Sequence, residues 1–223
     1  MLKTKNIFKA ILLTLFFASA CQASTQPAKT PKVPPDLSKI PVGMSVALFA
    51  GGCFWCMEAP FDKIPGVIST TSGYTDGFVA NPAYRKVANG VTGHTESIQI
   101  VFDPKTVSYE KLLSVFWRNI DPGAKDRQFC DRGTQYRSGI YAYDQQQLAA
   151  ARDSLRQLKS DGVITGKVFT EIKAATRFYR AEDYHQDFYK KNPAHYTRYR
   201  IGCGRDARLR EIWGRSTPQK VGH

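Results

Sequence analysis

Apolar and alternating segments, separated by Gly- and Pro-rich stretches, predict the strands of this chain. Residues 45–50 (SVALFA) are apolar and end at Gly51 and Gly52, a pattern typical of a buried strand. Residues 95–102 (TESIQIVF) alternate, as in a strand with one buried face. On such patterns we expect strands at residues 45–50, 67–74, 95–102, 138–143 and 167–174.

Apolar positions at helical spacing predict the helices. Asp144 can cap one amphipathic segment and Ser108 another. We expect helices at residues 53–63, 108–117, 144–160 and 181–191. Because helices and strands mix in this order, the pattern favours an α+β fold, a two-layer sandwich around a mixed or antiparallel sheet. The segments 75–93 and 120–137 read as long loops, where functional sites tend to lie.

The first residues have the layout of a secretory signal. Lysines precede an apolar run at 11–18, and small residues follow around Cys21. The run is much shorter than the roughly 20 residues that span a bilayer, so a permanent transmembrane helix is the less favoured reading. We expect a signal peptide at residues 1–23 and an exported, periplasmic protein. Acylation of Cys21, which would anchor a lipoprotein to the membrane, is the alternative.

The remaining 200 residues predict one domain between two short flanking segments. Residues 24–43 are Pro-rich with few large apolar side chains, as in an extended linker. A catalytic domain is expected at residues 44–214 and a basic tail at 215–223. A chain of 223 residues is long enough for one domain with a substantial core, but a second full domain is not expected.

The chain is strongly basic, with a formal charge of +13, or 13 − 3 = +10 once the three signal lysines are removed. Six arginines crowd the last part of the chain: Arg198, Arg200, Arg205, Arg208, Arg210 and Arg215. Such a patch can contact nucleic acid or anionic lipid. No zinc-finger, helix-turn-helix or RNA-binding signature accompanies it, so we expect a solvated basic surface and no nucleic-acid partner.

Apart from Cys21, four cysteines leave several chemistries open. They are Cys53, Cys56, Cys130 and Cys203. In an oxidising compartment they could form two structural disulfides, and no sequence argument selects one of the three pairings. The Cys-x-x-Cys spacing of the first two is also found in thioredoxin-like exchangers. A zinc site needs further ligands at compact spacing, which are absent, so we expect no metal.

The stretch GGCFWCME places Cys53 where a strand turns into a helix. Unpaired amide groups and the helix dipole at such a start favour a thiolate, which is a nucleophile, although a buried structural cysteine can occupy the same place. Phe54 and Trp55 are either core residues or an apolar slot for a small methyl or thioether group. Glu96, at the mouth of a strand, can be a general acid if burial raises its pKa, or a solvated surface residue.

Taken together, the strings GGCFW, SGYTDG, NPAYRKVANGVTGHTES, FWRNIDP, DRGTQYRSGIY and RAEDYHQDFYKKNP resemble the A-type peptide methionine sulfoxide reductases. The resemblance runs from about Ala47 to about Gly204. It implies an elaborated ferredoxin-like α+β sandwich with a mixed sheet. It also implies reduction of methionine-S-sulfoxide, free or in proteins, to methionine.

The resemblance assigns a role to each matching residue. Cys53 is the nucleophile that attacks the sulfoxide sulfur, and Phe54 and Trp55 hold the substrate methyl group. Glu96 protonates the sulfoxide oxygen, a poor leaving group until it is protonated. The polar groups around that oxygen are Tyr84, Tyr136 and Asp131. The family chemistry leaves Cys53 as a sulfenic acid, which a second thiol converts to a disulfide.

The second thiol has two candidates in this sequence. Many members carry resolving cysteines in a glycine-rich tail, where this chain has only Cys203, flanked by glycines that suggest a tail able to swing toward Cys53. Cys56 lies one helical turn from Cys53 and is the local alternative. We prefer Cys203, and expect Cys130 to be a buried residue near the site.

The resemblance implies no bound cofactor and recycling by thioredoxin or a similar dithiol. The expected partners are oxidised proteins or peptides, free methionine sulfoxide and this reductant, with the protein a monomer that meets a membrane only if Cys21 is lipidated. The competing hypothesis is an exported basic binding protein whose cysteines are all structural. Free thiols that are lost on contact with methionine sulfoxide would distinguish the two.

Overall fold

The computed structural model describes residues 36–214. The predicted signal peptide, Cys21, most of the predicted linker and the basic tail lie outside the described residues. Within 36–214, no helix has both the length and the apolar character needed to cross a membrane.

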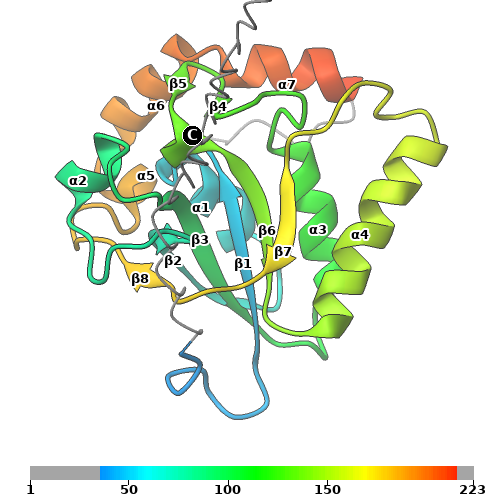
Figure 1. Cartoon of the computed structure of the whole chain (residues 1–223), viewed down its shortest axis with the longest axis horizontal. Helices are drawn as coiled ribbons and strands as arrows, with labels where there is room; N and C mark the ends of the chain where they lie inside the picture. The colour runs from blue at the N-terminus through cyan, green and yellow to red at the C-terminus, as the bar shows by residue number, and fades with distance from the viewer. Residues whose placement is uncertain (1–35, 215–223) are drawn as a thin grey trace, which may run out of the picture.

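A six-stranded sheet forms the centre of the molecule, in the order β7-β6-β1-β3-β2-β8 (Figure 1). All neighbouring strands are antiparallel except β6 and β7, which are parallel, so the sheet is mixed. The six strands are β1 (Ser45–Gly51), β2 (Val67–Thr75), β3 (Thr95–Phe102), β6 (Ser138–Ala142), β7 (Glu171–Ala174) and β8 (Tyr179–Arg180). A separate hairpin pairs β4 (Arg127–Gln128) with β5 (Asp131–Arg132).

Helices contribute to the main core from one side of the sheet. The helices are α1 (Trp55–Asp62), α2 (Tyr84–Ala88), α3 (Tyr109–Arg118), α4 (Gln145–Ser160), α5 (Phe188–Lys191), α6 (Pro193–Gly202) and α7 (Arg205–Trp213), with a 3-10 turn, η1, at Thr134–Tyr136. α1, α3 and α4 contact the sheet, and α3 lies beside α4 (Figure 1). Phe49 on β1 packs with Phe61 of α1 and Phe116 of α3. The predicted α+β fold with a mixed sheet is therefore confirmed.

The opposite face of β1 is covered without a helix. Leu48, Ala50 and Tyr141 are buried there, and the irregular segment that contains Ala175 and Phe178 packs against them. Because both of its faces are buried, β1 reads as a continuously apolar run rather than an alternating one. The strand that leads to GGCFWCME is thus the central, fully covered strand of the molecule.

Four predicted strands and two predicted helices match the structure to within one or two residues. The strands are those near residues 45–50, 67–74, 95–102 and 138–143. Ser108 and Asp144 are the N-caps of α3 and α4, and their side chains accept hydrogen bonds from backbone N–H groups at 3.2 and 2.7 Å. These elements carry either a continuous apolar run or a clear period in apolar positions, and that pattern determined the prediction.

Two predicted elements are wrong in extent, and a third differs at its start. The strand expected at 167–174 begins only at Glu171, where pairing with β6 starts. The helix expected at 181–191 is reduced to α5, because Asp187 has a positive φ of 54° that no α-helix contains. The helix expected at 53–63 begins at Trp55, with Phe54 as its N-cap, so Cys53 precedes the helix.

Cys203 does not lie in an irregular, glycine-rich tail. α6 ends at Gly202 and α7 begins at Arg205, so Cys203 lies in a tight junction between two helices. In Figure 1, α6 and α7 lie across the end of the molecule where β4 and β5 are found. α5 and α6 pack on α1, the helix that follows Cys53.

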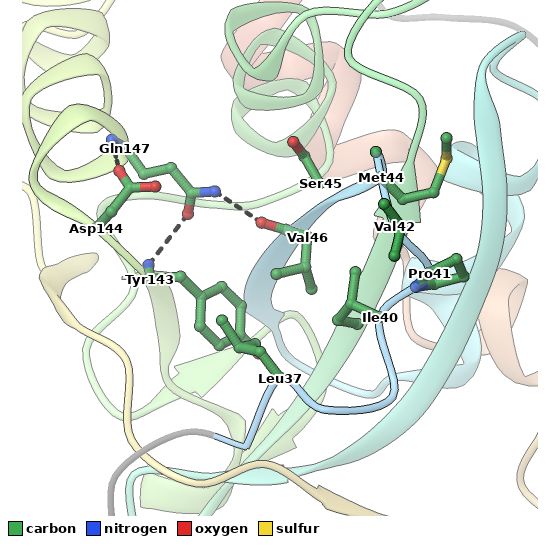
Figure 2. Close-up of a pocket in the computed structure, with 11 residues that line it drawn as sticks. Leu37, Ile40, Pro41, Val42, Met44, Ser45, Val46, Tyr143, Asp144 and Gln147 are labelled. Atoms are coloured by element: carbon green, nitrogen blue, oxygen red, sulfur yellow. Dashed lines mark hydrogen bonds between the residues drawn. The ribbon is translucent and has the colours of Figure 1, made fainter.

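A pocket of about 430 Å³ lies far from the predicted site residues, where the N-terminal segment meets α4 (Figure 2). Leu37 and Ile40 line it with Tyr143, and the Gln147 side chain links the backbone of Tyr143 to that of Val46. None of the residues predicted to carry chemistry lines this pocket.

Candidate active site

The turn between β1 and α1 positions the candidate nucleophile. Gly52 has a φ of +82°, and a Cβ at this position would lie 2.5 Å from Cβ of Gln128, so both the backbone and the available space require glycine. The turn directs the chain from the end of β1 into α1. Cys53 follows directly and is buried, with 7% of its surface exposed.

Cys53 and Cys56 form a pair of buried free thiols. The backbone N–H of Cys56 donates to the carbonyl of Cys53 at 3.1 Å, and the two side chains share a hydrogen bond. Burial, then the bond to Cys56, raises the pKa of Cys53 well above its usual value. The same bond, with help from Arg205, lowers the pKa of Cys56 to about 7 against the effect of burial.

The first proton of the thiol pair is therefore lost from Cys56 rather than from Cys53. This corrects the expectation that a helix start alone makes Cys53 a thiolate. The helix begins two residues later, and burial disfavours a charge on Cys53. The structure thus divides two tasks between the cysteines, with Cys56 able to accept the proton that Cys53 must lose to become a nucleophile.

Glu96, predicted as a general acid, lies buried beside the nucleophile. It is the second residue of β3, is 2% exposed, and accepts a hydrogen bond from the backbone N–H of Phe54 at 3.1 Å. Burial raises the pKa of Glu96 to about 8, although the bond from Phe54 lowers it and the charge of Asp131 adds to the rise. A carboxyl group with this pKa is mostly protonated at neutral pH and can donate its proton.

The other predicted polar residues reach the same place from three separate elements. Tyr84 comes from α2, Tyr136 from η1 and Asp131 from β5. Burial, followed by the charges of Glu96 and Cys53, raises the pKa of Tyr84 to about 12. Burial, with the charge of Glu96 next, also raises the pKa of Tyr136, so both phenols stay protonated and can donate hydrogen bonds. Burial raises the pKa of the Asp131 carboxyl.

The aromatic side chains of Phe54 and Trp55 lie on one side of the site. Phe54 is 1% exposed, and its ring centroid lies 4.9 Å from that of His185. Trp55 is half-buried and stacks on Phe188 with centroids 3.7 Å apart and planes within 5°. The indole Nε1 of Trp55 donates to Nδ1 of His185 at 3.0 Å, which fixes the orientation of the indole ring.

The imidazole of His185 is a site residue that the sequence analysis missed. Burial lowers its pKa to about 4, so it is neutral at physiological pH and its Nδ1 can accept from Trp55. The motif RAEDYHQDFYKKNP contained the signal, but no role was assigned to its histidine. Glu182 of the same motif also contributes, because its Oε1 accepts from the backbone N–H of Tyr84 at 2.8 Å.

Tyr199 is a second missed residue, and it lies over the thiol pair. Its hydroxyl donates to Asp131 and also shares a hydrogen bond with Cys53, while its ring meets the edge of Trp55 at 5.8 Å. Burial, then the charge of Cys53, raises the pKa of this phenol. No sequence signal distinguished it from the other tyrosines, because α6 was not expected.

Cys130 and Cys203 are joined in a disulfide with their Cα atoms 4.8 Å apart. Cys130 is exposed, so the expectation that it is buried is wrong. Cys203 is bonded to it and is not a free thiol in this form of the protein. Only one bridge forms among the four described cysteines, so the hypothesis of two structural disulfides does not fit this structure.

The same bridge bears on metal binding. Ligand atoms of Cys130, Cys203 and Asp131 lie within 4.8 Å of one another. A metal is bound by thiolates, and a disulfide sulfur carries no such charge. The bridge instead connects the residue before β5, which carries Asp131, to the C-cap of α6. This C-cap, Cys203, lies one turn after Tyr199, whose carbonyl accepts from the N–H of Cys203 at 2.9 Å.

The site combines a buried thiol, an anionic neighbour, a protonated carboxyl group and two phenol donors beside an aromatic wall. A thiol in this setting can attack a neutral centre that carries an oxygen atom, and Glu96 can protonate that oxygen as it leaves. The aromatic wall fits a small apolar group. These features are those of a redox site in which the electrons come from the two thiols themselves.

Comparison of sequences relates the chain to known reductases. Residues 45–217 match the family model described as peptide methionine sulfoxide reductase. The chain is 49% identical over 169 residues to "Peptide methionine sulfoxide reductase MsrA" of Bacillus subtilis, with 76% of this chain and 96% of the relative covered. It is 48% identical over 170 residues to the protein of the same name from Bacillus licheniformis, covering 76% of this chain and 94% of that one.

Solved structures show the same relationship. The methionine sulfoxide reductase A of Corynebacterium diphtheriae superposes with a TM-score of 0.63 at 33% identity, covering 74% of this chain and 87% of that chain. Mxr1 from Saccharomyces cerevisiae in its reduced form superposes with a TM-score of 0.66 at 29% identity, covering 72% and 93%. Both likenesses extend over most of residues 36–214.

Proposed function

The chain belongs to the peptide methionine sulfoxide reductase family, and on this premise we propose that Cys53 attacks the sulfur of methionine-S-sulfoxide while Glu96 protonates its oxygen. The enzyme is an oxidoreductase that converts methionine sulfoxide to methionine. The observation that carries the assignment of residues is the hydrogen bond of 3.1 Å from the Phe54 N–H to Glu96, which places a protonated carboxyl group beside the nucleophile.

The aromatic wall and the polar groups orient the substrate by binding different parts of it. The methyl group of the sulfoxide packs against Phe54 and Trp55, which offer apolar surface. The sulfoxide oxygen then points to Glu96, Tyr84 and Tyr136, which are all protonated at neutral pH. A thioether product lacks this oxygen and loses these hydrogen bonds, so methionine is held less tightly than its sulfoxide.

The first step transfers the oxygen atom and two electrons. The Cys53 proton passes to the Cys56 thiolate, and the Cys53 sulfur bonds to the sulfoxide sulfur while Glu96 gives its proton to the oxygen. Collapse of this adduct releases methionine and leaves Cys53 as a sulfenic acid, Cys56 as a thiol and Glu96 as a carboxylate. One negative charge is present before the step and one after it, so no outside proton is needed.

The second step forms a disulfide between Cys53 and Cys56. The sulfur of Cys56 attacks the sulfenic sulfur of Cys53, and the hydroxyl group leaves as water with the proton of Cys56. The sequence favoured Cys203 for this role. The structure supports Cys56, because its thiol is free and hydrogen bonded to Cys53, whereas Cys203 is bonded to Cys130.

A dithiol of the thioredoxin type returns the enzyme to its starting state. Exchange of its two thiols with the Cys53–Cys56 disulfide restores both cysteines. The family chemistry and the adjacent spacing of the two cysteines support this reductant. The electrons come entirely from thiols, so the reaction uses no bound cofactor.

The function is tested with the two sulfoxide epimers. Purified protein with dithiothreitol is expected to convert free and peptide-bound methionine-S-sulfoxide and to leave the R epimer unchanged. Without reductant, one equivalent of methionine should appear per protein with the loss of two thiols, and mass spectrometry should find a Cys53 to Cys56 linkage. Full activity in Cys53→Ser protein, or no conversion of either epimer, would contradict the assignment.

We also propose that the protein is exported, and that repair of oxidised proteins takes place outside the cytoplasm. The support is the lysine-rich start, the apolar run at 11–18 and the small residues before Cys21, all of which lie outside the described residues. Cell fractionation with mass analysis of the mature N-terminus tests this. A protein that starts at Met1 and stays in the cytoplasm would refute export, and a Cys21→Ser variant distinguishes a lipoprotein from a freely secreted form.

A further inference from the structure

The side chain of Arg205 is buried beside the thiol pair. It is 1% exposed, although it is the first residue of α7 near the end of the chain. One guanidinium nitrogen donates to the carbonyl of Gly51 at 3.2 Å and to the carbonyl of Asn119 at 2.6 Å, and it lies 3.0 Å from the sulfur of Met57. Gly51 comes two residues before Cys53, and Met57 directly follows Cys56.

This buried cation has no carboxylate partner. Within residues 36–214, no carboxylate oxygen forms an ion pair with Arg205, and its Nε has no hydrogen-bond partner. Its charge lies over the ring of Phe129 at 4.3 Å, which compensates only part of the lost hydration. Buried arginines normally pair with an acid, so this one requires an anion of another kind nearby.

The anion that fits is the thiolate of the cysteine pair. Arg205 acts electrostatically on Cys56 more than on any other group, and after it on Arg200 and Cys53. The charged and titratable groups that act on Cys56 are Cys53, Arg205, Arg200 and Asp131, and Cys56 in turn acts on Glu96 and Tyr196. Arg200 already holds Asp206 through three hydrogen bonds, whereas Arg205, which forms no ion pair within residues 36–214, acts electrostatically on Asp131 as well as on the thiol pair.

Resting on the proposed function, we propose that Arg205 is a positioning residue that keeps one negative charge on the Cys53–Cys56 pair. With that charge on Cys56, the pair can take up the proton of Cys53 and then close the disulfide. The cation also ties the end of β1 to α7 through the Gly51 carbonyl, so the same side chain fixes the turn that presents Cys53.

The titration of Cys56 in Cys53→Ser protein tests the proposal directly. In this variant Cys56 is the one free thiol among the described cysteines, and serine keeps a hydroxyl donor toward it. The absorbance of the thiolate is followed against pH, with the Cys53→Ser/Cys56→Ser protein as reference. We expect a thiol pKa at least one unit below the ordinary value of about 8.5. An ordinary or raised pKa with Arg205 in place would overturn the proposal without any further variant.

Two substitutions separate the charge of Arg205 from its structural role. Arg205→Gln keeps amide donors for the carbonyls but removes the charge, and should raise the pKa of Cys56 and slow disulfide formation about tenfold near neutral pH. Arg205→Lys keeps the charge and should change the pKa of Cys56 and the rate of disulfide formation by much less. Arg208→Gln, which removes a half-exposed arginine of the same helix, is the matched control and should change neither.

Equal effects of the glutamine and lysine variants on the pKa of Cys56 would mean that Arg205 acts through packing alone, and would overturn the proposal. The readouts also keep this inference apart from the proposed function. Release of methionine from the S-sulfoxide by the wild-type protein tests the function itself. If methionine is released while Cys56 titrates as an ordinary thiol, only the role of Arg205 is lost.

Discussion

The backbone N–H of Phe54 donates a hydrogen bond to the Glu96 carboxyl group at 3.1 Å. The residue directly after the nucleophile therefore holds the acid, and a movement of the turn displaces both together. This bond stabilises the anion that Glu96 becomes after it has given up its proton. Burial thus keeps Glu96 protonated before the reaction, and a single backbone donor stabilises its carboxylate after the proton has been transferred.

Replacement of Glu96 by glutamine should remove proton delivery and preserve the fold. Glutamine has nearly the same shape, and its amide oxygen can still accept from Phe54. We expect the rate of methionine release in a single turnover to fall roughly a hundredfold to ten-thousandfold, the usual contribution of a general acid. Glu110→Gln, at an exposed position of α3, is the control and should leave the rate unchanged. A fall of less than about threefold in Glu96→Gln would assign proton delivery to another group.

The rate of methionine release should have an optimum between about pH 7 and pH 8. Below the lower value Cys56 binds a proton, and the pair loses the base that activates Cys53. Above the higher value Glu96, whose pKa burial has raised, loses the proton that it must donate. Single-turnover rates are measured against pH, and the two pKa values obtained in this way belong to the site as a whole. The alkaline fall should disappear in Glu96→Gln, and its persistence there would mean that Glu96 is not its source.

Serine substitutions should identify the resolving cysteine. Cys56→Ser protein is expected to hold Cys53 as a sulfenic acid that dimedone traps, since Cys56 is the other free thiol among the cysteines of residues 36–214. Cys203→Ser protein should still form the Cys53–Cys56 disulfide at a similar rate, measured by quenched reaction and mass spectrometry. A Cys53 to Cys203 linkage in the wild-type protein, or trapping only in Cys203→Ser, would restore the role that the sequence suggested for Cys203.

His185→Ala should weaken substrate binding more than the chemical step. The substitution removes the acceptor at 3.0 Å from Trp55 Nε1, so the indole loses its fixed orientation. Loss of one such bond predicts a rise in KM of about tenfold, with a smaller change in kcat. His195→Ala is the control, because this exposed histidine has edge contacts with the rings of Trp55 and Phe188.

A conservative variant separates orientation from simple packing. His185→Asn offers an amide oxygen near the position of Nδ1 and should restore part of the lost affinity. Equal KM values for the asparagine and alanine variants would show that the Trp55 hydrogen bond does not matter for binding.

The predictable part of the molecule follows from short-range pattern. β1 and β3 carry apolar runs or alternation, and the capped helices α3 and α4 carry a strong helical period. The helix expected at 181–191 failed because a left-handed residue, Asp187, interrupts a segment whose composition suits a helix. A single left-handed residue of this kind leaves little trace in composition, since aspartate occurs both in helices and in the left-handed conformation.

The site was predictable where a motif carried it and not where tertiary contacts built it. Cys53 and Glu96 were found from their strings, and the structure brings them together. The distribution of charge between Cys53 and Cys56 depends on Arg205, which is about 150 residues away in the sequence, and on burial. No local pattern encodes either effect, so the sequence pointed to a thiolate on Cys53 and to Cys203 as the resolving cysteine.

The disulfide between Cys130 and Cys203 also affects the covalent topology of the working enzyme. It closes a loop with a sequence separation of 73 that contains neither Cys53 nor Cys56. A linkage from Cys53 to Cys203 would span 203 − 53 = 150 positions and would have to open and close in every turnover. With the reactive pair confined to one helical turn, the chain keeps the same large ring throughout the cycle, and only a ring of four residues is made and broken.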